Sequence, residues 1–491
     1  MNNPSNYDTD FIDDFDMSLI ETEDIYDEDM HNDDFIIKNS VLMNYIGSDE
    51  HIVIPDWITV INDDVFMGNH QLKSISIPKS VTRIGKFAFV DCINLENIYI
   101  PNSVTSIGIS AFEHCINLKC VKLPENLTVI ESSTFGSCTS LSQIKIPDCV
   151  GRIEDSAFSQ CTNLVSVDLP EDLYYIGKAA FSECENLKNI AIPDGVNYIN
   201  EETFACSGLE NIILPDELIS IKKNAFHLCE NLLNVSMPSK LGEIEEYAFS
   251  YCTSLCDISF PRNLKHIKKL AFHNCCNFHS IKLPLDLEDI GEGAFSCCEN
   301  LTNIIMHDNL AYIGDEAFAD CISLTDIHIP DSVIAMGMKV FDCCTSLKNV
   351  YISNHITEIK ESTFMNCTDL KNVHMPYDLI EIGECAFANC QSLVGIEIPY
   401  VDKIKKCAFM DCESLIYVEI PNGITKISQS TFQNCISLTH IAIPDTVTEI
   451  GIGAFYNCKN LTNIDIPDSV KKIGKKAFDG CDKLTLPEKY R

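Results

Sequence analysis

The side chains with the most suggestive chemistry recur at one position of a repeated pattern, between two apolar residues of a predicted strand. Side chains at such a position point outward. Seven of them form two runs of consecutive repeats: Tyr99, Lys122 and Lys145, and then Ile305, His328, Tyr351 and His374. The first run is aromatic and basic, and the second is amphipathic. Because tyrosine is enriched at interface cores and histidine adds pH sensitivity, the second run is our preferred binding site for a partner. Alternatively, both runs are chance occupants of an exposed strand.

Metal binding and catalysis are not indicated by the sequence. His328 and His374 lie two repeats apart, roughly 10 Å at strand spacing, which is too far to share one metal ion directly. The cysteines lack the paired Cys-x-x-Cys spacing of a zinc site. No Gly-rich phosphate loop, Gly-x-Ser-x-Gly or His-Glu-x-x-His motif is present. We therefore expect no enzyme activity, no metal and no cofactor.

The two runs are positioned by a repeat that fills most of the chain. A phenylalanine recurs 19 times from Phe66 to Phe478, with sixteen intervals of 23 residues and two of 22 residues. Such a strict period predicts a solenoid, in which every coil touches only its neighbours. Coils stacked at the strand spacing of about 4.8 Å would form a curved array roughly 90 Å long.

The spacing within one repeat assigns a role to each part. Residues 97–100 alternate between polar and apolar side chains, as in a strand with one buried face. Pro101 lacks an N–H group and ends this strand. Val104 and Ile107 are spaced to point inward along a second short strand. Residues 111–115, with a phenylalanine and a cysteine, predict a short helical or 3₁₀ turn.

The consensus Leu-x-x-Ile-x-Ile-Pro-x-x-Val-x-x-Ile-Gly-x-x-Ala-Phe-x-x-Cys resembles the repeats of the BspA-like leucine-rich repeat family. Residues 35–47 resemble the capping segment that often opens such arrays. The resemblance covers about 450 of the 491 residues and implies a leucine-rich repeat solenoid of parallel strands. It also implies a binding role, since family members are mostly surface or secreted adhesion and antigenic proteins of bacteria and protozoa.

The pattern divides the chain into three parts. Residues 1–34 hold 13 Asp and Glu and no Lys or Arg, and we expect them to be disordered. They form either a solubilising tail or a short motif that folds on a basic partner. Residues 35–55 predict an N-terminal cap of two short strands, 35–38 and 41–45, followed by the first strand of the array. Residues 56–491 predict the leucine-rich repeat solenoid.

Cysteine is abundant and regularly placed. Eighteen of the 26 cysteines fall in one register of the repeat. We interpret this column as small buried hydrophobic side chains, because parallel side chains in a ladder are poorly oriented for disulfide geometry. So many unpaired thiols favour a reducing compartment.

Composition narrows the function further. A net charge of −37 opposes binding to nucleic acids and to anionic membranes. No apolar run approaches the ~20 residues that span a bilayer, and the first residues do not have the pattern of a signal peptide. We expect a monomeric, cytoplasmic, non-enzymatic scaffold that binds a protein partner along the strand face. The alternative is a cell-surface adhesin or antigen that is exported without a classical signal.

Overall fold

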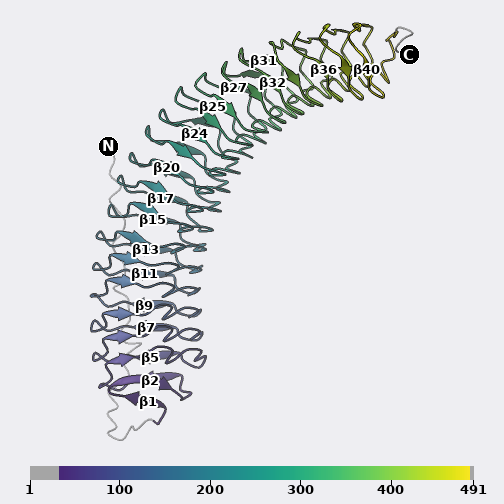
Figure 1. The fold of residues 1–491 in the computed structure, drawn as a ribbon. Helices are drawn as coiled ribbons and strands as arrows, with labels where there is room; N and C mark the ends of the chain where they lie inside the picture. Colours follow the sequence, from purple (N-terminus) through teal and green to yellow (C-terminus); the bar gives the residue numbers. More distant parts are fainter. Residues whose placement is uncertain (1–32, 487–491) are drawn as a thin grey trace.

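The computed structural model describes residues 33–486, which form one solenoid of about 19 coils (Figure 1). The coils stack almost straight in the N-terminal half and bend into an arc towards the C-terminus. The regular elements of the described residues are all β-strands. The predicted solenoid of parallel strands is confirmed. Most of the predicted acidic tail, residues 1–32, lies outside the described residues.

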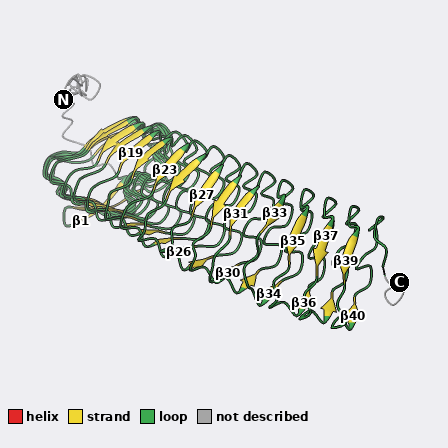
Figure 2. Ribbon diagram, turned by 90° about the horizontal axis from the view of Figure 1, so that it is seen from above, coloured by secondary structure: helices red, strands yellow, loops and turns green. Residues whose placement is uncertain are grey.

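Each coil contributes one strand to each of two rows, which run along opposite sides of the solenoid (Figure 2). The odd row consists of β3 (His51–Val53), β5 (Ser74–Ser76), β7 (Asn97–Tyr99), β9 (Cys120–Lys122), β11 (Gln143–Lys145), β13 (Ser166–Asp168), β15 (Asn189–Ala191), β17 (Asn211–Ile213), β19 (Asn234–Ser236), β21 (Asp257–Ser259), β23 (Ser280–Lys282), β25 (Asn303–Ile305), β27 (Asp326–His328), β29 (Asn349–Tyr351), β31 (Asn372–His374), β33 (Gly395–Ile396), β35 (Tyr417–Glu419), β37 (His440–Ala442) and β39 (Asn463–Asp465). The even row consists of the two-residue strands β4 (Val60–Ile61), β6 (Arg83–Ile84), β8 (Ser106–Ile107), β10 (Val129–Ile130), β12 (Arg152–Ile153), β14 (Tyr175–Ile176), β16 (Tyr198–Ile199), β18 (Ser220–Ile221), β20 (Glu243–Ile244), β22 (His266–Ile267), β24 (Asp289–Ile290), β26 (Tyr312–Ile313), β28 (Ala335–Met336), β30 (Glu358–Ile359), β32 (Glu381–Ile382), β34 (Lys403–Ile404), β36 (Lys426–Ile427), β38 (Glu449–Ile450) and β40 (Lys472–Ile473).

An antiparallel hairpin precedes the first coil. It consists of β1 (Phe35–Lys38) and β2 (Val41–Tyr45). Its two turn residues, Asn39 and Ser40, both have left-handed φ values, 51° and 62°, as tight hairpin turns require. Strand β2 then pairs in parallel with β4, so the hairpin joins the stack as its first layer.

Equivalent residues of successive coils lie side by side. In the odd row, His328 pairs with Tyr351, and Tyr351 pairs with His374. Each position of the repeat therefore becomes a column along the solenoid. The hydrogen-bonded ladder of the odd row is interrupted in places, and one sheet ends at β31 while the next begins at β33.

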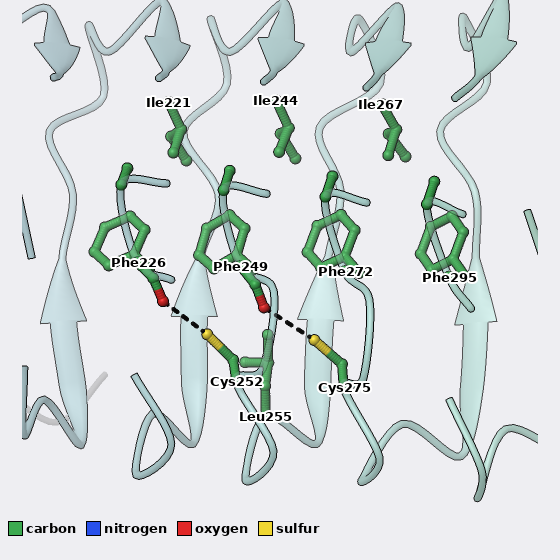
Figure 3. Packing of buried hydrophobic residues seen from close by; sticks show 14 of the residues in the cluster. Ile221, Phe226, Ile244, Phe249, Cys252, Leu255, Ile267, Phe272, Cys275 and Phe295 are labelled. Atoms are coloured by element: carbon green, nitrogen blue, oxygen red, sulfur yellow. Dashed lines mark hydrogen bonds between the residues drawn. The ribbon is translucent and has the colours of Figure 1, made fainter. Parts of the chain in front are cut away.

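A column of stacked phenylalanine rings fills the space between the two rows (Figure 3). Phe249 and Phe272, for example, are fully buried, with ring centroids 5.3 Å apart. Beside them runs the cysteine column, in which each buried thiol donates to the carbonyl oxygen of an earlier phenylalanine; the Cys252 Sγ lies 3.2 Å from the Phe226 oxygen. The column is interrupted at Cys206, whose side chain is only partly buried. The next residue, Ser207, is buried in its place, beside the Cys229 thiol of the following coil.

The short helical turn predicted for residues 111–115 is wrong. Ser110 and His114, on either side of Phe112, have left-handed φ values of 54° and 59°, which interrupt a helix after each turn. Every second backbone N–H group of this segment also donates to a carbonyl oxygen of the next coil. The Phe112 N–H, for example, donates to the Thr134 oxygen at 2.9 Å. The segment is therefore a series of turns that bonds to its neighbours as a ladder does.

Candidate protein-binding surface on the odd row

An open hollow of about 740 Å³ lies on the odd row between β25 and β35. The second predicted run lines it in full: Ile305, His328, Tyr351 and His374. These outward side chains are exposed or half-buried, while the residue before each of them is buried in the core or packed against it. The alternation of the strand thus places the run on the outer face, with its backbone fixed by the core beneath.

Three rings of the run are stacked on one another. We call His328, Tyr351 and His374 the aromatic ladder; its centroids are 4.5 Å apart at the first step and 4.4 Å apart at the second. The rings are close to parallel, with interplanar angles of 25° and 19°. Tyr377, 77% exposed, meets the His374 ring edge-on at 6.1 Å. The ladder therefore shows ring edges and a large exposed tyrosine to solvent.

A second row of polar side chains runs beside the rings on the same face. We call Asp326, Asn349 and Asn372 the amide ladder. The Asn349 Nδ2 donates to the Asp326 Oδ1 at 2.6 Å, and the Asn372 Nδ2 donates to the Asn349 Oδ1 at 2.7 Å. The hydrogen bond from Asn349 lowers the pKa of Asp326 from its ordinary value. The two ladders together present aromatic and hydrogen-bonding groups in parallel.

The hydroxyl group of the central ring has a fixed partner. The Asn354 Nδ2 donates to the Tyr351 hydroxyl oxygen at 2.9 Å. Asn354 is itself held by Asp331, whose Oδ1 accepts from the Asn354 backbone N–H at 2.9 Å; this bond lowers the pKa of Asp331. Tyr351 is therefore oriented before any partner arrives.

Past the last members of the two ladders, the hollow ends at Gly395 and Tyr417. The amide column continues at Gly395, which has no side chain, and the ring of Tyr417 lies over it, 2.7 Å from where a Cβ would be. Both residues line the hollow, and we did not predict either from the sequence. The sequence does mark this end of the hollow, because the interval between Phe387 and Phe409 is 22 residues instead of 23. That interval contains β33, which is shortened to two residues.

The first predicted run lies elsewhere on the odd row. The Lys122 Nζ lies 5.5 Å from the Tyr99 ring centroid, in cation–π contact. Lys145 is exposed in the next coil, where its ladder partner is Asp168. Seven coils separate β11 from β25, so the structure does not bring the two runs together.

Charge is distributed differently over the two rows. Within residues 33–486, none of the outward third residues of the odd-row strands forms an ion pair, whereas ion pairs recur along the even row. In the same residues there is no group of three or more His, Cys, Asp or Glu side chains placed to hold a metal ion. That part of the chain also has no helix of the length and apolarity needed to cross a membrane.

The family model for the BspA type leucine-rich repeat region matches residues 36–165, 151–277, 265–394 and 358–485. The chain belongs to the BspA-type leucine-rich repeat family. The resemblance inferred from the consensus is therefore confirmed. Proteins built from leucine-rich repeats are generally non-enzymatic scaffolds that bind other proteins.

Several solved structures are similar to this chain. A leucine-rich repeat protein from Bacteroides ovatus is 27% identical, covers 90% of this chain and 97% of its own, and superposes with a TM-score of 0.53. A leucine-rich cell surface protein from Faecalibacterium prausnitzii is 24% identical, covers 83% and 92%, and has a TM-score of 0.35. The pneumococcal vaccine antigen PcpA is 20% identical, covers 87% and 79%, and has a TM-score of 0.28. A comparison with curated protein sequences finds no match.

Proposed function

We propose that this BspA-type repeat protein is a non-enzymatic scaffold that binds a protein partner along the odd row, with the hollow at the centre of contact. The observation that carries this proposal is the aromatic ladder. Three stacked rings line a hollow on a face whose outward strand positions make no ion pair in the described residues. Aromatic side chains that become fully desolvated supply most of the energy at protein interfaces.

The state of the surface before binding supports the same proposal. The Tyr351 hydroxyl is held by Asn354, and the amide ladder is already hydrogen-bonded. Groups that are fixed in advance lose little conformational entropy on association. Ile305, 43% exposed, adds an apolar contact at one end of the hollow. The first run, centred on Lys122, is a separate second contact for a long partner.

The test compares variants of the two rows in one capture experiment. Wild-type protein, Tyr351→Ala with His374→Ala, and Tyr312→Ala are immobilised at equal density and exposed to extract of the source cells. Tyr312 is the matched control, because it is a 41% exposed tyrosine in β26 of the even row. We expect the double variant to lose the captured partner by about tenfold or more, which is typical of aromatic hot-spot residues.

The control variant should capture as wild type does, and both variants should melt within about 2 °C of wild type, because the side chains lie outside the core. Equal capture by wild type and the double variant would rule out the hollow as the contact. Loss of capture by Tyr312→Ala alone would move the site to the even row.

We propose a cytoplasmic location, since the column cysteines are buried and donate their thiols to backbone carbonyl oxygens, as reduced cysteines do, and reducing compartments keep thiols reduced. The similar solved structures, which include a leucine-rich cell surface protein, favour the alternative of a cell-surface location. Protease treatment of intact source cells tests this. Repeats that survive until lysis place the protein inside the cell. Repeats removed by external protease favour the alternative, a surface adhesin.

A further inference from the structure

Two cysteines outside the buried column occupy the same position in adjacent coils. Cys385 and Cys407 each precede the phenylalanine of their repeat by two residues. No other two of the eight irregular cysteines share a position in neighbouring coils. Both side chains are partly exposed, so reagents in solution reach them, unlike the thiols of the buried column.

The backbone holds these two positions together. The Cys385 N–H donates to the Lys406 oxygen of the next coil at 3.1 Å. Both cysteines have left-handed φ values, 53° and 56°, so their backbones follow the same path. Equivalent residues of hydrogen-bonded coils lie about 4.8 Å apart, within the Cα separation of about 4.4–6.8 Å found in disulfides. The parallel orientation that opposes disulfides in the buried column can be relieved here by side-chain rotation, because both side chains are partly exposed and neither thiol is held by a backbone carbonyl oxygen. The two side chains also lie close enough for each cysteine to shift the pKa of the other.

The buried-column cysteines of the same two coils have thiols in a different environment. The thiols of Cys390 and Cys412 are buried and donate to backbone carbonyl oxygens, each at 3.2 Å. Burial raises the pKa of Cys412 to about 12. These thiols are satisfied and closed to reagents. Cys385 and Cys407 instead are partly exposed, and the neighbouring thiol of each is the other.

We propose that Cys385 and Cys407 form an oxidisable dithiol, which closes a disulfide between two coils when a small-molecule disulfide such as oxidised glutathione reacts with it. The thiolate of one cysteine attacks the glutathione disulfide, forms a mixed disulfide and releases one glutathione thiolate. The second cysteine, as its thiolate, then attacks the protein sulfur of the mixed disulfide and releases the second glutathione. Two protein thiols are oxidised to one disulfide, one glutathione disulfide is reduced to two thiols, and the two protons lost by the protein thiols are taken up by the two glutathione thiolates.

The surroundings favour Cys407 as the first nucleophile. Burial raises the pKa of Cys385 to about 11. Burial raises the pKa of Cys407 as well, with a further increase from the Glu384 carboxylate, but the neighbouring Cys385 thiol and the Lys406 ammonium group oppose that rise. Because the thiolate is the reactive form, the reaction should accelerate as pH rises above neutral.

The experiment treats the folded full-length protein with oxidised glutathione, blocks remaining thiols, and maps the peptides by mass spectrometry. We expect a peptide pair linked through Cys385 and Cys407, with no glutathione on either. Cys149 and Cys256, two exposed cysteines without a neighbouring thiol at the same position, report reagent access and should carry glutathione. In Cys385→Ser, Cys407 should retain glutathione, because no second thiol resolves it.

Two results overturn the proposal. One is separate glutathione adducts on Cys385 and Cys407 in the wild-type protein, which would show that the thiols cannot meet. The other is that both stay unmodified while Cys149 and Cys256 react, which would show that the pair is closed to the reagent. A Cys343→Ser variant is the matched control, since this partly exposed thiol has no cysteine at its position in the next coil and its loss should leave the linked peptide unchanged.

Discussion

The two rows of strands have the same core beneath them and carry different chemistry on their outer faces. Along the even row, charges are paired between coils: Glu449 accepts from Lys426 at 3.1 Å and from Lys472 at 3.0 Å. Along the odd row, the outward positions carry the aromatic ladder and make no ion pair in the described residues. Ion pairs also occur beside the odd row, between Lys73 and Glu50, Lys119 and Glu96, and Lys188 and Glu210, but they lie just before its strands. The even row thus pairs charges within its strands, whereas the outward strand positions of the odd row show ring edges and polar groups to solvent.

The largest predicted effect comes from the core that both rows share. Phe272 is fully buried, with the rings of Phe249 and Phe295 centred 5.3 Å and 5.4 Å away and Phe260 packed edge-on. Phe272→Ala should lower the free energy of unfolding by about 3–5 kcal/mol, because it leaves a cavity in the column. Denaturant unfolding measures the change, with Lys282→Ala on the surface as control. A loss of less than about 1 kcal/mol would contradict the view that one column supports both faces.

The sequence was sufficient for most of this architecture, because the evidence for it is periodic. Alternation around Ile98 predicted the strand, and the spacing of Val104 and Ile107 predicted the second row, which is observed as β8. Left-handed φ values, by contrast, are not confined to one residue type, because residues as different as Ser110 and His114 adopt them. The helical turn was therefore predicted wrongly.

The candidate site was only partly accessible from sequence. The outward position of Tyr351 follows from strand alternation, but ring stacking and the hydrogen bond from Asn354 depend on the distance between coils. Gly395 and Tyr417 were missed because the end of the hollow depends on an absent side chain and on a ring from the following coil. The binding role of the run stays a prediction.

An effect of intermediate size is expected when variants of the two rows are unfolded at different salt concentrations. Burial raises the pKa of Glu381, but its hydrogen bonds and charge interactions with Lys405 and Lys403 outweigh this, and the net pKa is lowered. Glu381→Gln should therefore lower the free energy of unfolding by about 0.5–1 kcal/mol at low salt, and by less at about 1 M salt, where exposed charges are screened.

The matched control for this measurement is Glu397→Gln on the odd row. Glu397 is exposed and forms no ion pair in the described residues, so its loss should cause no salt-dependent decrease. Equal salt dependence for the two variants would remove the proposed difference between the rows. The comparison needs only unfolding curves of the same protein at two salt concentrations.

The smallest effect concerns a single carboxyl group on the odd row. Asn349 lowers the pKa of Asp326 by donating to its Oδ1 at 2.6 Å. A carboxyl group with a lowered pKa in the folded state adds stability above its unfolded pKa, and that stability is lost as pH falls through the folded value. Asn349→Ala should thus return the pKa of Asp326 towards its ordinary value and slightly reduce acid stability, as carboxyl NMR titration would show.

Asn303→Ala is the control for this titration, since Asn303 holds the same position two coils earlier than Asn349 and donates to Ser280, which does not ionise. Its loss should leave the titration of Asp326 unchanged. If Asn349→Ala also leaves it unchanged, the amide ladder does not act on the carboxyl group. If only Asn349→Ala shifts it, the ladder is intact in solution, and the odd row keeps its hydrogen bonds ordered although its outward strand positions form no ion pair in the described residues.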